Sequence, residues 1–493
     1  MKKLAAKLFA AYIHRKNQKW IQNPISTQEK TRIYLQQKAK NTAFGVDHRL
    51  GDIQSYEDFK AQVPVVDYEG IKSYVERVVA GESDVLWPGK PLYFAKTSGT
   101  TSGAKYIPIS SESMPTHISA ARNAILNYIH QTGNTNFVTG KQIFLQGSPE
   151  MEEVNGVQLG RLSGIAAHYV PSYLLKNRMP SWETNCIEDW ETKVDAIVEE
   201  TLPEQMSVIA GIPSWVQMYF ERLVAKTGKP VGEIFPDFQL FIHGGVNYKP
   251  YVPVFEELIG RPVDQIELFP ASEGFFAYQD RMDQEGLLLL LNQGIFYEFI
   301  PVDSFGDENP KRLWLADVEI GVNYVLILNT TAGLWGYNIG DTVRFVSKDP
   351  YRIVVTGRLK HYISAFGEHV IGKEVESAME LALQEITARV KEFTVAPQIS
   401  PAEGLPYHEW MVEFDAPPEQ LAVFEAAIDR EMQKQNVYYK DLIQGKVLRP
   451  VKVTPVAPQA FQAYMKSIGK LGGQNKVPRL SNDRKIADAL QTL

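Results

Sequence analysis

The chain has 493 residues, of which 44% are hydrophobic and 22% are charged. This composition is typical of a globular protein, and the length exceeds what one hydrophobic core usually supports, so two or more domains are expected. Lys and Arg number 51 against 58 Asp and Glu, which gives a net charge of −7. This argues against nucleic-acid binding, since such proteins usually carry a basic excess. The single cysteine, Cys186, excludes an internal disulfide and favours a reducing, cytoplasmic location.

The first twenty residues combine basic and apolar positions. Leu4, Leu8, Ala11 and Ile13 recur at roughly helical spacing while lysines interrupt the apolar run, so a basic amphipathic helix is expected rather than a signal peptide. Such a helix either packs on the main domain or lies on a membrane surface. The longest apolar run, near 287–291, is far shorter than the roughly 18 residues of a membrane span. No integral membrane association is therefore expected.

Helical periodicity dominates the first ninety residues, with segments 31–42 and 68–80 as examples. Short β-type runs then alternate with helix-length segments, which is typical of an α/β sheet. Segment 286–355 holds several β-type runs in succession and predicts an antiparallel or barrel-like section. After Gly357, helix patterns and β-type runs over roughly 130 residues predict a compact α+β domain. The β-type runs before 286 lie at 91–95, 142–145, 206–210, 238–242 and 265–269.

A stretch rich in Ser, Thr and Gly, TSGTTSGAK at 97–105, lies between a strand-like run and a helix pattern that starts near Ser111. Glycines permit close backbone approach, successive N–H groups can enclose an anion, and hydroxyls and a lysine add donors and charge. The spacing GxxxGxK departs from GxxxxGK[ST] and excludes a Walker P-loop. The stretch predicts either a different phosphate loop or a polar surface loop. Its candidate ligands are Ser98, Gly99, Thr100, Thr101, Ser102 and Lys105.

The sequence FPASEGF, residues 269–275, follows a β-type run. A carboxylate at a strand end, preceded by a hydroxyl, suits a Mg²⁺–phosphate site, because proteins hold Mg²⁺ through one or two carboxylates together with substrate phosphates. Glu273 would then bind the metal and Ser272 a phosphate, while Phe269 could stack on a base. An ordinary loop acid and a core aromatic residue explain the same pattern.

Two further sequences have turn and sugar-binding features. HGGVNY, residues 243–248, places Gly244 and Gly245 after a β-type run, where the backbone could approach a flat ligand or form a plain tight turn. In YNIGD the carboxylate of Asp341 could accept hydrogen bonds from both hydroxyls of a ribose. Arg358 would reinforce such a site if it lay nearby. A turn acid and a surface arginine are the simpler interpretation.

Taken together and in this order, the motifs resemble those of the adenylate-forming superfamily of acyl-CoA synthetases, adenylation domains and luciferases. KYIP after the phosphate loop, FYEFIPVD at 296–303, TTAGLWGYNIGD at 330–341 and QNKVPR at 474–479 resemble the Gretchen Hagen acyl acid–amido synthetases. The early segments look like the bacterial branch of that family, and the resemblance covers nearly the whole chain. Asn338 departs from it, because the superfamily usually has arginine there.

The resemblance implies an α/β fold with a large N-terminal ATP- and acid-binding domain, 1–357, and a small mobile α+β domain, 358–493. It implies ATP and Mg²⁺ as cofactors, and a small carboxylic acid and an amino acid as substrates. The acid would attack the α-phosphorus of ATP to form an acyl-adenylate and pyrophosphate, and the amine would then displace AMP. An acyl-CoA ligase, with CoA as the acceptor, is the alternative.

The family pattern also implies roles for single residues. Glu273 would hold Mg²⁺, and 98–105 the β- and γ-phosphates. Lys476 would reach the α-phosphate and the acid carboxylate in one orientation of the small domain, with the hinge at Lys360. For the base of the amine step, only position suggests His243 and His369. Adenine and ribose would contact Gly244, Gly245, Phe269, Ser272, Asp341 and Arg358.

Overall fold

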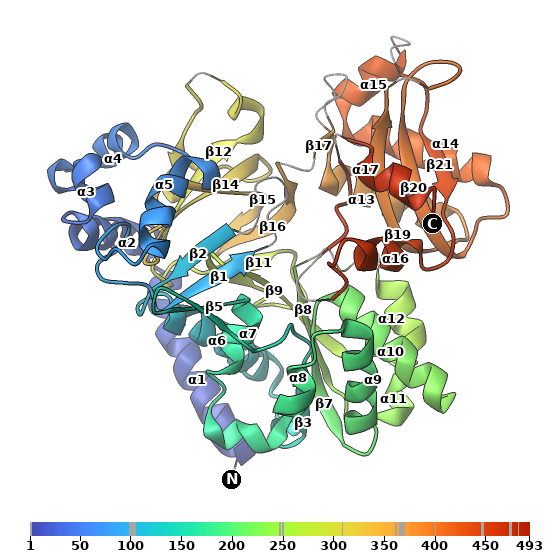
Figure 1. Ribbon diagram of the computed structural model, residues 1–493, viewed down its shortest axis with the longest axis horizontal. Coiled ribbons are helices and arrows are strands. Elements are labelled where there is room, and N and C mark those ends of the chain that lie inside the picture. The colour runs from blue at the N-terminus through green and yellow to red at the C-terminus, as the bar shows by residue number, and fades with distance from the viewer. Residues whose placement is uncertain are drawn as a thin grey trace. The chain divides into compact units, whose positions relative to one another are not determined.

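The computed structural model divides into two compact units (Figure 1). The first comprises Met1–Val246 and Leu258–Val355, and the second Asn247–Glu257 and Thr356–Leu493. The structure describes residues 2–97, 105–245, 248, 251–307, 309–359, 362–363, 370–399, 401–444, 448–472, 476–481 and 483–493.

The first unit begins with the helices α1 (Lys2–Ile21), α2 (Pro24–Ala39), α3 (Ala43–Asp47), α4 (Tyr56–Gln62) and α5 (Tyr68–Val79). This confirms the predicted helical character of the N-terminal region. Local caps set the helix starts: Asp67 accepts hydrogen bonds from the N–H groups of Glu69 and Gly70, and Ser55 forms a capping box with Asp58. Two helical segments are predicted here: most of 31–42 lies within α2, and most of 68–80 lies within α5.

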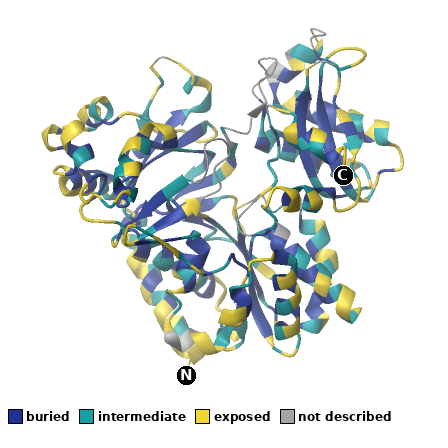
Figure 2. Ribbon diagram, in the orientation of Figure 1, coloured by how far each residue is buried: buried dark blue, intermediate teal, exposed yellow. Residues whose placement is uncertain are grey.

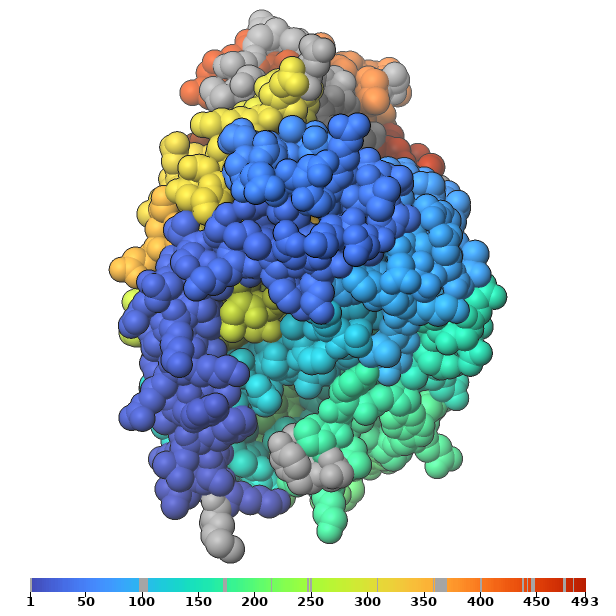
Figure 3. Space-filling model, turned by 90° about the vertical axis from the view of Figure 1, so that its left-hand side faces the viewer, coloured from blue at the N-terminus to red at the C-terminus, as the bar shows by residue number. Residues whose placement is uncertain are grey.

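The basic helix α1 packs on α6 (Met114–Thr132). The helix is confirmed, but its predicted apolar face is only partly buried, because Ile13 is buried whereas Leu4 and Leu8 are 65% and 66% exposed. The residues that α1 buries are Ala10, Ile13, Asn17 and Trp20. Figure 3 shows the N-terminal residues, in dark blue, at the surface. Among the helices formed by the described residues, none has both the length and the apolar character needed to cross a membrane.

A small sheet lies beside these helices, with the strand order β2-β1-β5-β4. The helix predicted to start near Ser111 is α6, which begins at Met114. The sequence did not predict the strand β2, which lies between the phosphate-loop motif and this helix. The strands are β1 (Tyr93–Thr97), β2 (Lys105–Ile109), β4 (Glu152–Val154) and β5 (Val157–Gly160).

Within the described residues, twelve strands form the central sheet, in the order β13-β12-β14-β15-β16-β11-β10-β9-β8-β7-β3-β6. Strands β6, β3, β7, β8 and β9 run parallel. The strands are β3 (Lys141–Phe144), β6 (Arg178–Met179), β7 (Met206–Gly211), β8 (Leu240–Gly244), β9 (Asp264–Ala271), β10 (Gly274–Tyr278), β11 (Leu287–Leu289), β12 (Ile295–Pro301), β13 (Leu313–Trp314), β14 (Asn323–Thr330), β15 (Tyr337–Lys348) and β16 (Tyr351–Arg358).

The antiparallel pairing expected for segment 286–355 is confirmed, since β12 pairs antiparallel with β13 and β14, and β14 with β15. These strands continue the parallel half of the same sheet, and a barrel-like closure stays a prediction. Figure 2 shows that the sheet strands are mostly buried. The helices that separate the parallel strands along the chain are α7 (Leu162–Ala167), α8 (Trp182–Asn185), α9 (Trp190–Thr201), α10 (Pro213–Thr227), α11 (Val231–Ile234) and α12 (Val252–Ile259), and most of α12 belongs to the second unit.

The second unit is a mixed α and β structure, as the sequence predicts. Its sheet has the order β19-β20-β21, with β19 and β20 antiparallel and β20 and β21 parallel. The elements are β17 (Tyr362–Ile363), β18 (Val370–Ile371), α13 (Gly372–Glu385), β19 (Arg389–Gln398), β20 (Tyr407–Ala416), α14 (Leu421–Gln435), α15 (Val437–Gln444), β21 (Lys452–Pro455), α16 (Ala460–Ser467) and α17 (Lys485–Leu490).

Two buried histidines of the first unit predict acid sensitivity. Burial lowers the pKa of His117 to about 4 and that of His243 to about 3, because the charged ring is costly in the interior. The unfolded chain binds these protons near pH 6.5, so folding stability is lost as the pH falls from about 6.5 toward 4. We expect the free energy of unfolding in urea to be lower by at least about 2 kcal/mol at pH 5.0 than at pH 7.5. Equal stability at both pH values would contradict this.

Candidate functional site

The parallel strands bring two of the predicted motifs to one edge of the central sheet. Because β3, β7, β8 and β9 run in the same direction, their carboxyl ends lie together, where ligands bind in open α/β sheets. Gly244 ends β8, and Ser272 and Glu273 follow the neighbouring strand β9. The structure therefore places these two motifs side by side (Figure 1).

Ser272 and Glu273 form a two-residue turn between β9 and β10, in which Ala271 pairs with Gly274. Ser272 is buried and Glu273 is half-buried. In the described part of the chain, no group of three or more His, Cys, Asp or Glu side chains could hold a metal ion. A single carboxylate fits Mg²⁺ only if substrate phosphates supply further ligands, which is the usual arrangement for this ion.

The backbone at positions 244 and 245 requires glycine, for a steric reason at Gly244 and a conformational reason at Gly245. A Cβ atom on Gly244 would lie 2.2 Å from the carbonyl oxygen of Leu268 on β9, so no other residue fits there without moving the sheet. Gly245 has a φ of +84°, in the left-handed region that favours glycine. The close approach at Gly244 and the φ of Gly245 account for both glycines without a ligand, and contact with adenine stays a prediction.

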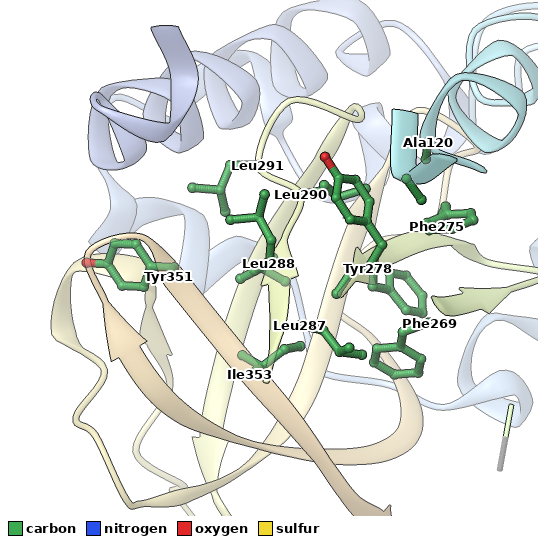
Figure 4. Close-up of a cluster of buried hydrophobic side chains, with 14 of the residues drawn as sticks. Ala120, Phe269, Phe275, Tyr278, Leu287, Leu288, Leu290, Leu291, Tyr351 and Ile353 are labelled. Carbon is green, nitrogen blue, oxygen red and sulfur yellow. The ribbon is translucent and has the colours of Figure 1, made fainter. Parts of the chain in front are cut away.

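Phe269 lies in the hydrophobic core rather than on an open surface. It is 7% exposed, and its ring meets that of Phe276 edge-on with the centroids 5.0 Å apart. Figure 4 shows it beside Leu287 and below Tyr278 in the same cluster. Packing in the hydrophobic core therefore explains why an aromatic residue stands at position 269, and stacking on a base stays a prediction.

Lys105 stands at the start of β2, opposite Thr97 at the end of β1. Its Nζ lies 5.3 Å from the centroid of the Tyr68 ring, and the Tyr68 hydroxyl accepts a hydrogen bond from the N–H of Tyr106 at 3.0 Å. α5 thereby fixes the strand that carries this cation. The other residues predicted for phosphate binding, Ser98, Gly99, Thr100, Thr101 and Ser102, lie outside the described residues.

Asp341 lies in a β-bulge. The ladder between β14 and β15 shifts register opposite residues 339–341, and bulges commonly redirect side chains beside functional sites. Gly340 has a φ of +84°, and its N–H donates to Oδ1 of Asn338 at 2.8 Å. Asn338 stands where the superfamily resemblance leads one to expect arginine. Its short side chain shapes the bulge that carries Asp341.

A buried polar network supports the segment before this bulge. The carboxylate of Glu298, which is 0% exposed, accepts hydrogen bonds from Nε and Nη2 of Arg312 at 2.7 and 2.6 Å and from Nδ2 of Asn329 at 2.8 Å. It also accepts one from the Tyr56 hydroxyl at 3.0 Å. Oδ1 of Asn329 in turn accepts from the N–H of Gly336 at 2.7 Å. The network thereby links four segments, those of Tyr56, Glu298, Arg312 and Asn329, to the loop before β15.

The sequence alone does not reveal the whole of this network, although Glu298 lies in FYEFIPVD, one of the segments that carry the family resemblance. One sequence feature does indicate it: an acidic residue in the middle of an apolar run predicts a polar or charged partner in the core. The partners were not readable, since Arg312 lies just before β13 and Tyr56 on α4.

Lys476 belongs to the second unit and is exposed. The residues after it are anchored on β19: the carbonyl oxygen of Arg479 accepts from the N–H of Val395 at 2.9 Å. The Arg479 guanidinium forms ion pairs with Glu376 and Glu392. The lysine is thus carried at the end of a fixed segment. The side chain of Arg358 is not described, and Lys360 and His369 lie outside the described residues.

Comparison with known protein families finds matches along most of the chain. The GH3 family N-terminal domain matches residues 14–263, the central domain 288–358 and the C-terminal domain 373–485. Indole-3-acetic acid-amido synthetase GH3.4 of Arabidopsis thaliana is 22% identical over 93% of this chain and 89% of that protein. Jasmonoyl–L-amino acid synthetase GH3.5 of Oryza sativa subsp. japonica is 22% identical over 88% of each.

Solved structures share the fold. The GH3.15 acyl acid amido synthetase superposes with a TM-score of 0.79 at 17% identity, over 95% of this chain and 93% of that one. A 2-hydroxyisobutyryl-CoA ligase, solved with an acyl-adenylate, superposes with a TM-score of 0.61 at 14% identity, over 94% and 90%. The three matched domains follow one another in order along almost the full length. The chain therefore belongs to the GH3 family of acyl acid amido synthetases.

Proposed function

We propose that the carboxyl edge of β8 and β9 is where this ATP-dependent acyl acid amido synthetase binds its nucleotide and its acid. The observation that carries the proposal is the adjacency of two motifs: the glycines after β8 and the Ser272–Glu273 turn after β9 lie on neighbouring parallel strands. A nucleotide at this edge would meet the Glu273 carboxylate, which could hold a metal, and the glycines at the end of β8, on strands about 4.8 Å apart.

The reaction proceeds through two displacements. An oxygen of the acid carboxylate attacks the α-phosphorus of ATP, pyrophosphate leaves, and an acyl-adenylate forms. The amine of an amino acid then attacks the acyl carbon, the bond to the bridging oxygen breaks, and AMP leaves with that oxygen. The first step brings two anions together, so fixed positive charge at the α-phosphate lowers its barrier.

The two steps need residues that hold the metal, the phosphates and the nucleoside. Glu273 would hold Mg²⁺, which when bound supplies Lewis-acid charge at the phosphates. Residues 98–105 would hold the β- and γ-phosphates, and Lys476 the α-phosphate and the acid carboxylate. Adenine and ribose would contact Gly244, Gly245, Phe269, Ser272, Asp341 and Arg358. His243 is a poor candidate for the base of the amine step, because burial lowers its pKa to about 3.

Further assignments rest on the family resemblance. The small domain, 358–493, would rotate about Lys360 relative to the large domain, 1–357, between the two steps. The early segments favour a bacterial-type member, and the single cysteine favours the cytoplasm. CoA as the acceptor is the competing function, because a CoA ligase shares the fold and the adenylation step.

Product identity tests the function. Acid-dependent exchange of pyrophosphate into ATP should appear with a subset of carboxylic acids, and mass spectrometry should then find an amide with an amino acid. A thioester with CoA in place of the amide would select the alternative. Absence of exchange with every acid would contradict adenylation.

The ribose assignment gives a separate prediction. If Asp341 accepts hydrogen bonds from the ribose hydroxyls, the enzyme should prefer ATP to 2′-deoxy-ATP by about 10-fold or more in kcat/KM, since a hydrogen bond to a charged group contributes roughly 1.5–3 kcal/mol. Asp341→Ala should abolish this preference, and Asn338→Ala should weaken it by relaxing the bulge. Pyrophosphate exchange with both nucleotides measures the ratio. Ser347→Ala, on the same strand, is the control, and an unchanged ratio in Asp341→Ala would remove the residue from the ribose site.

A further inference from the structure

A polar cluster lies at the carboxyl end of β3, on the same sheet edge as the proposed nucleotide site. The strand ends at Phe144, and Gln146 and Gly147 follow it. In the sheet, β3 is three strands from β9, which corresponds to about 14 Å at the usual strand spacing. None of the roles assigned above uses this place.

Gln146 is the centre of the cluster and is 2% exposed. With its amide oriented to suit its neighbours, Nε2 donates to the carbonyl oxygen of Ser163 at 2.9 Å. Its Oε1 accepts hydrogen bonds from Nδ2 of Asn185 at 2.8 Å and from Nη2 of Arg178 at 3.0 Å. The hydroxyl of Ser163, which is 5% exposed, has no hydrogen-bond partner in the structure. A buried donor without a partner is costly and indicates a missing ligand or water.

Three cations belong to this cluster or lie beside it. Lys193 on α9 is 1% exposed, and its Nζ donates to the carbonyl oxygen of Asn185 at 2.6 Å. Arg178 donates to the carbonyl oxygen of Ala167 at 2.9 Å. Arg161 is half-buried, and a Cβ atom on Gly147 would lie 3.1 Å from its Cδ and 3.4 Å from its Nη1. The glycine thus lets the arginine lie against the end of β3.

None of these cations has a carboxylate within 4 Å among the described residues, although the chain carries a net charge of −7. Burial lowers the pKa of Lys193 to about 8; the charge of Glu188 opposes this shift and that of Arg161 adds to it. Burying positive charge without a counter-charge is unfavourable, and buried charges in proteins are normally paired. The cluster therefore has the electrostatic character of an anion site.

We propose that Arg161, Lys193 and Ser163 bind a carboxylate group carried by an organic substrate, and that this group is a second carboxylate at the remote end of the acyl acid. The assignment rests on the proposed function. The reacting carboxyl group must lie at the α-phosphate near β9, so a group bound about 14 Å away belongs to the far end of a longer molecule. The α-carboxylate of the amino acid is a poorer match, because it lies only two bonds from the amine that must reach the acyl carbon.

The test compares dicarboxylic acids of increasing chain length with their monomethyl esters in pyrophosphate exchange. The native enzyme should prefer a diacid to its ester by about 10-fold or more in kcat/KM, the range expected for a charge-assisted hydrogen bond. Arg161→Gln should lose this preference through a higher KM for the diacid, with exchange on the ester unchanged, and Arg161→Lys should keep part of it. Lys193→Met is the second variant. Arg222→Gln, an exposed arginine on α10, is the control.

The outcomes separate the two assignments. Unchanged diacid exchange in Arg161→Gln, together with a raised KM for the amino acid in amide formation, would keep the anion site but overturn its assignment to the acid. An unchanged preference and an unchanged amino acid KM, in variants that melt at the native temperature, would overturn the site itself. Absence of exchange with every acid would overturn the proposed function and this inference with it.

Discussion

Lys476→Ala is expected to reduce acid-dependent pyrophosphate exchange by about 100-fold or more, because loss of one preorganised group at the developing charge typically costs 10²–10³ in rate. ATP binding should change by less than about threefold, since the lysine is assigned to the transition state of adenylation rather than to the ground state. The exposed lysine is carried by a segment that Arg479 anchors on β19. Removing its side chain should therefore leave the second unit folded.

A second readout separates this role from a general loss of function. When acyl-adenylate is supplied ready-made, Lys476→Ala should form the amide at close to the native rate, because the lysine is assigned to the first step only. Lys470→Ala, a nearby lysine of the same unit, is the control and should retain exchange. Equal losses of ATP binding and of exchange would overturn the role of Lys476.

Glu298→Gln is expected to lower the free energy of unfolding by about 3–5 kcal/mol, the usual result of removing one partner of a buried ion pair. The substitution leaves Arg312, whose side chain is 9% exposed, with an uncompensated charge. It also weakens the bonds from Tyr56 and Asn329. Urea denaturation followed by fluorescence measures the change.

Glu285→Gln provides the matched control for this prediction. Glu285 pairs with Arg344 at 3.6 Å, but its side chain is 68% exposed, and exposed pairs contribute only about 0–1 kcal/mol. A loss in Glu298→Gln no larger than that in Glu285→Gln would show that the network does not stabilise the fold.

The order of secondary structure could be read from the sequence because it depends on local periodicity. The alternation of β-type runs and helices predicts the parallel strands, and the run of β-type segments after residue 286 predicts antiparallel pairing. The strand β2 escaped prediction because it is only five residues long and begins at the last residue of the Ser/Thr/Gly-rich stretch. The buried face of α1 was misjudged because Leu4 and Leu8 have the right spacing but lie beyond the part of the helix that is covered.

The candidate site could be predicted as a set of motifs but not as a set of contacts. The proximity of Gly244 to the turn at Glu273 follows from the pairing of β8 with β9, which no local pattern encodes. Likewise, the constraint on Gly244 comes from a carbonyl oxygen of the neighbouring strand. The partners of Glu298 and the cations around Gln146 come from distant segments, so only the folded chain brings them together.

Isotope transfer tests the two-step account most directly. When the acid carboxylate is labelled with ¹⁸O, attack on the α-phosphorus places one labelled oxygen between the acyl carbon and the phosphorus, and the amine step releases it in AMP. We expect mass spectrometry to find one ¹⁸O atom in each AMP and one in the amide. Label in inorganic phosphate, with ADP as the nucleotide product, would show that the acid attacks the γ-phosphorus and would contradict adenylation.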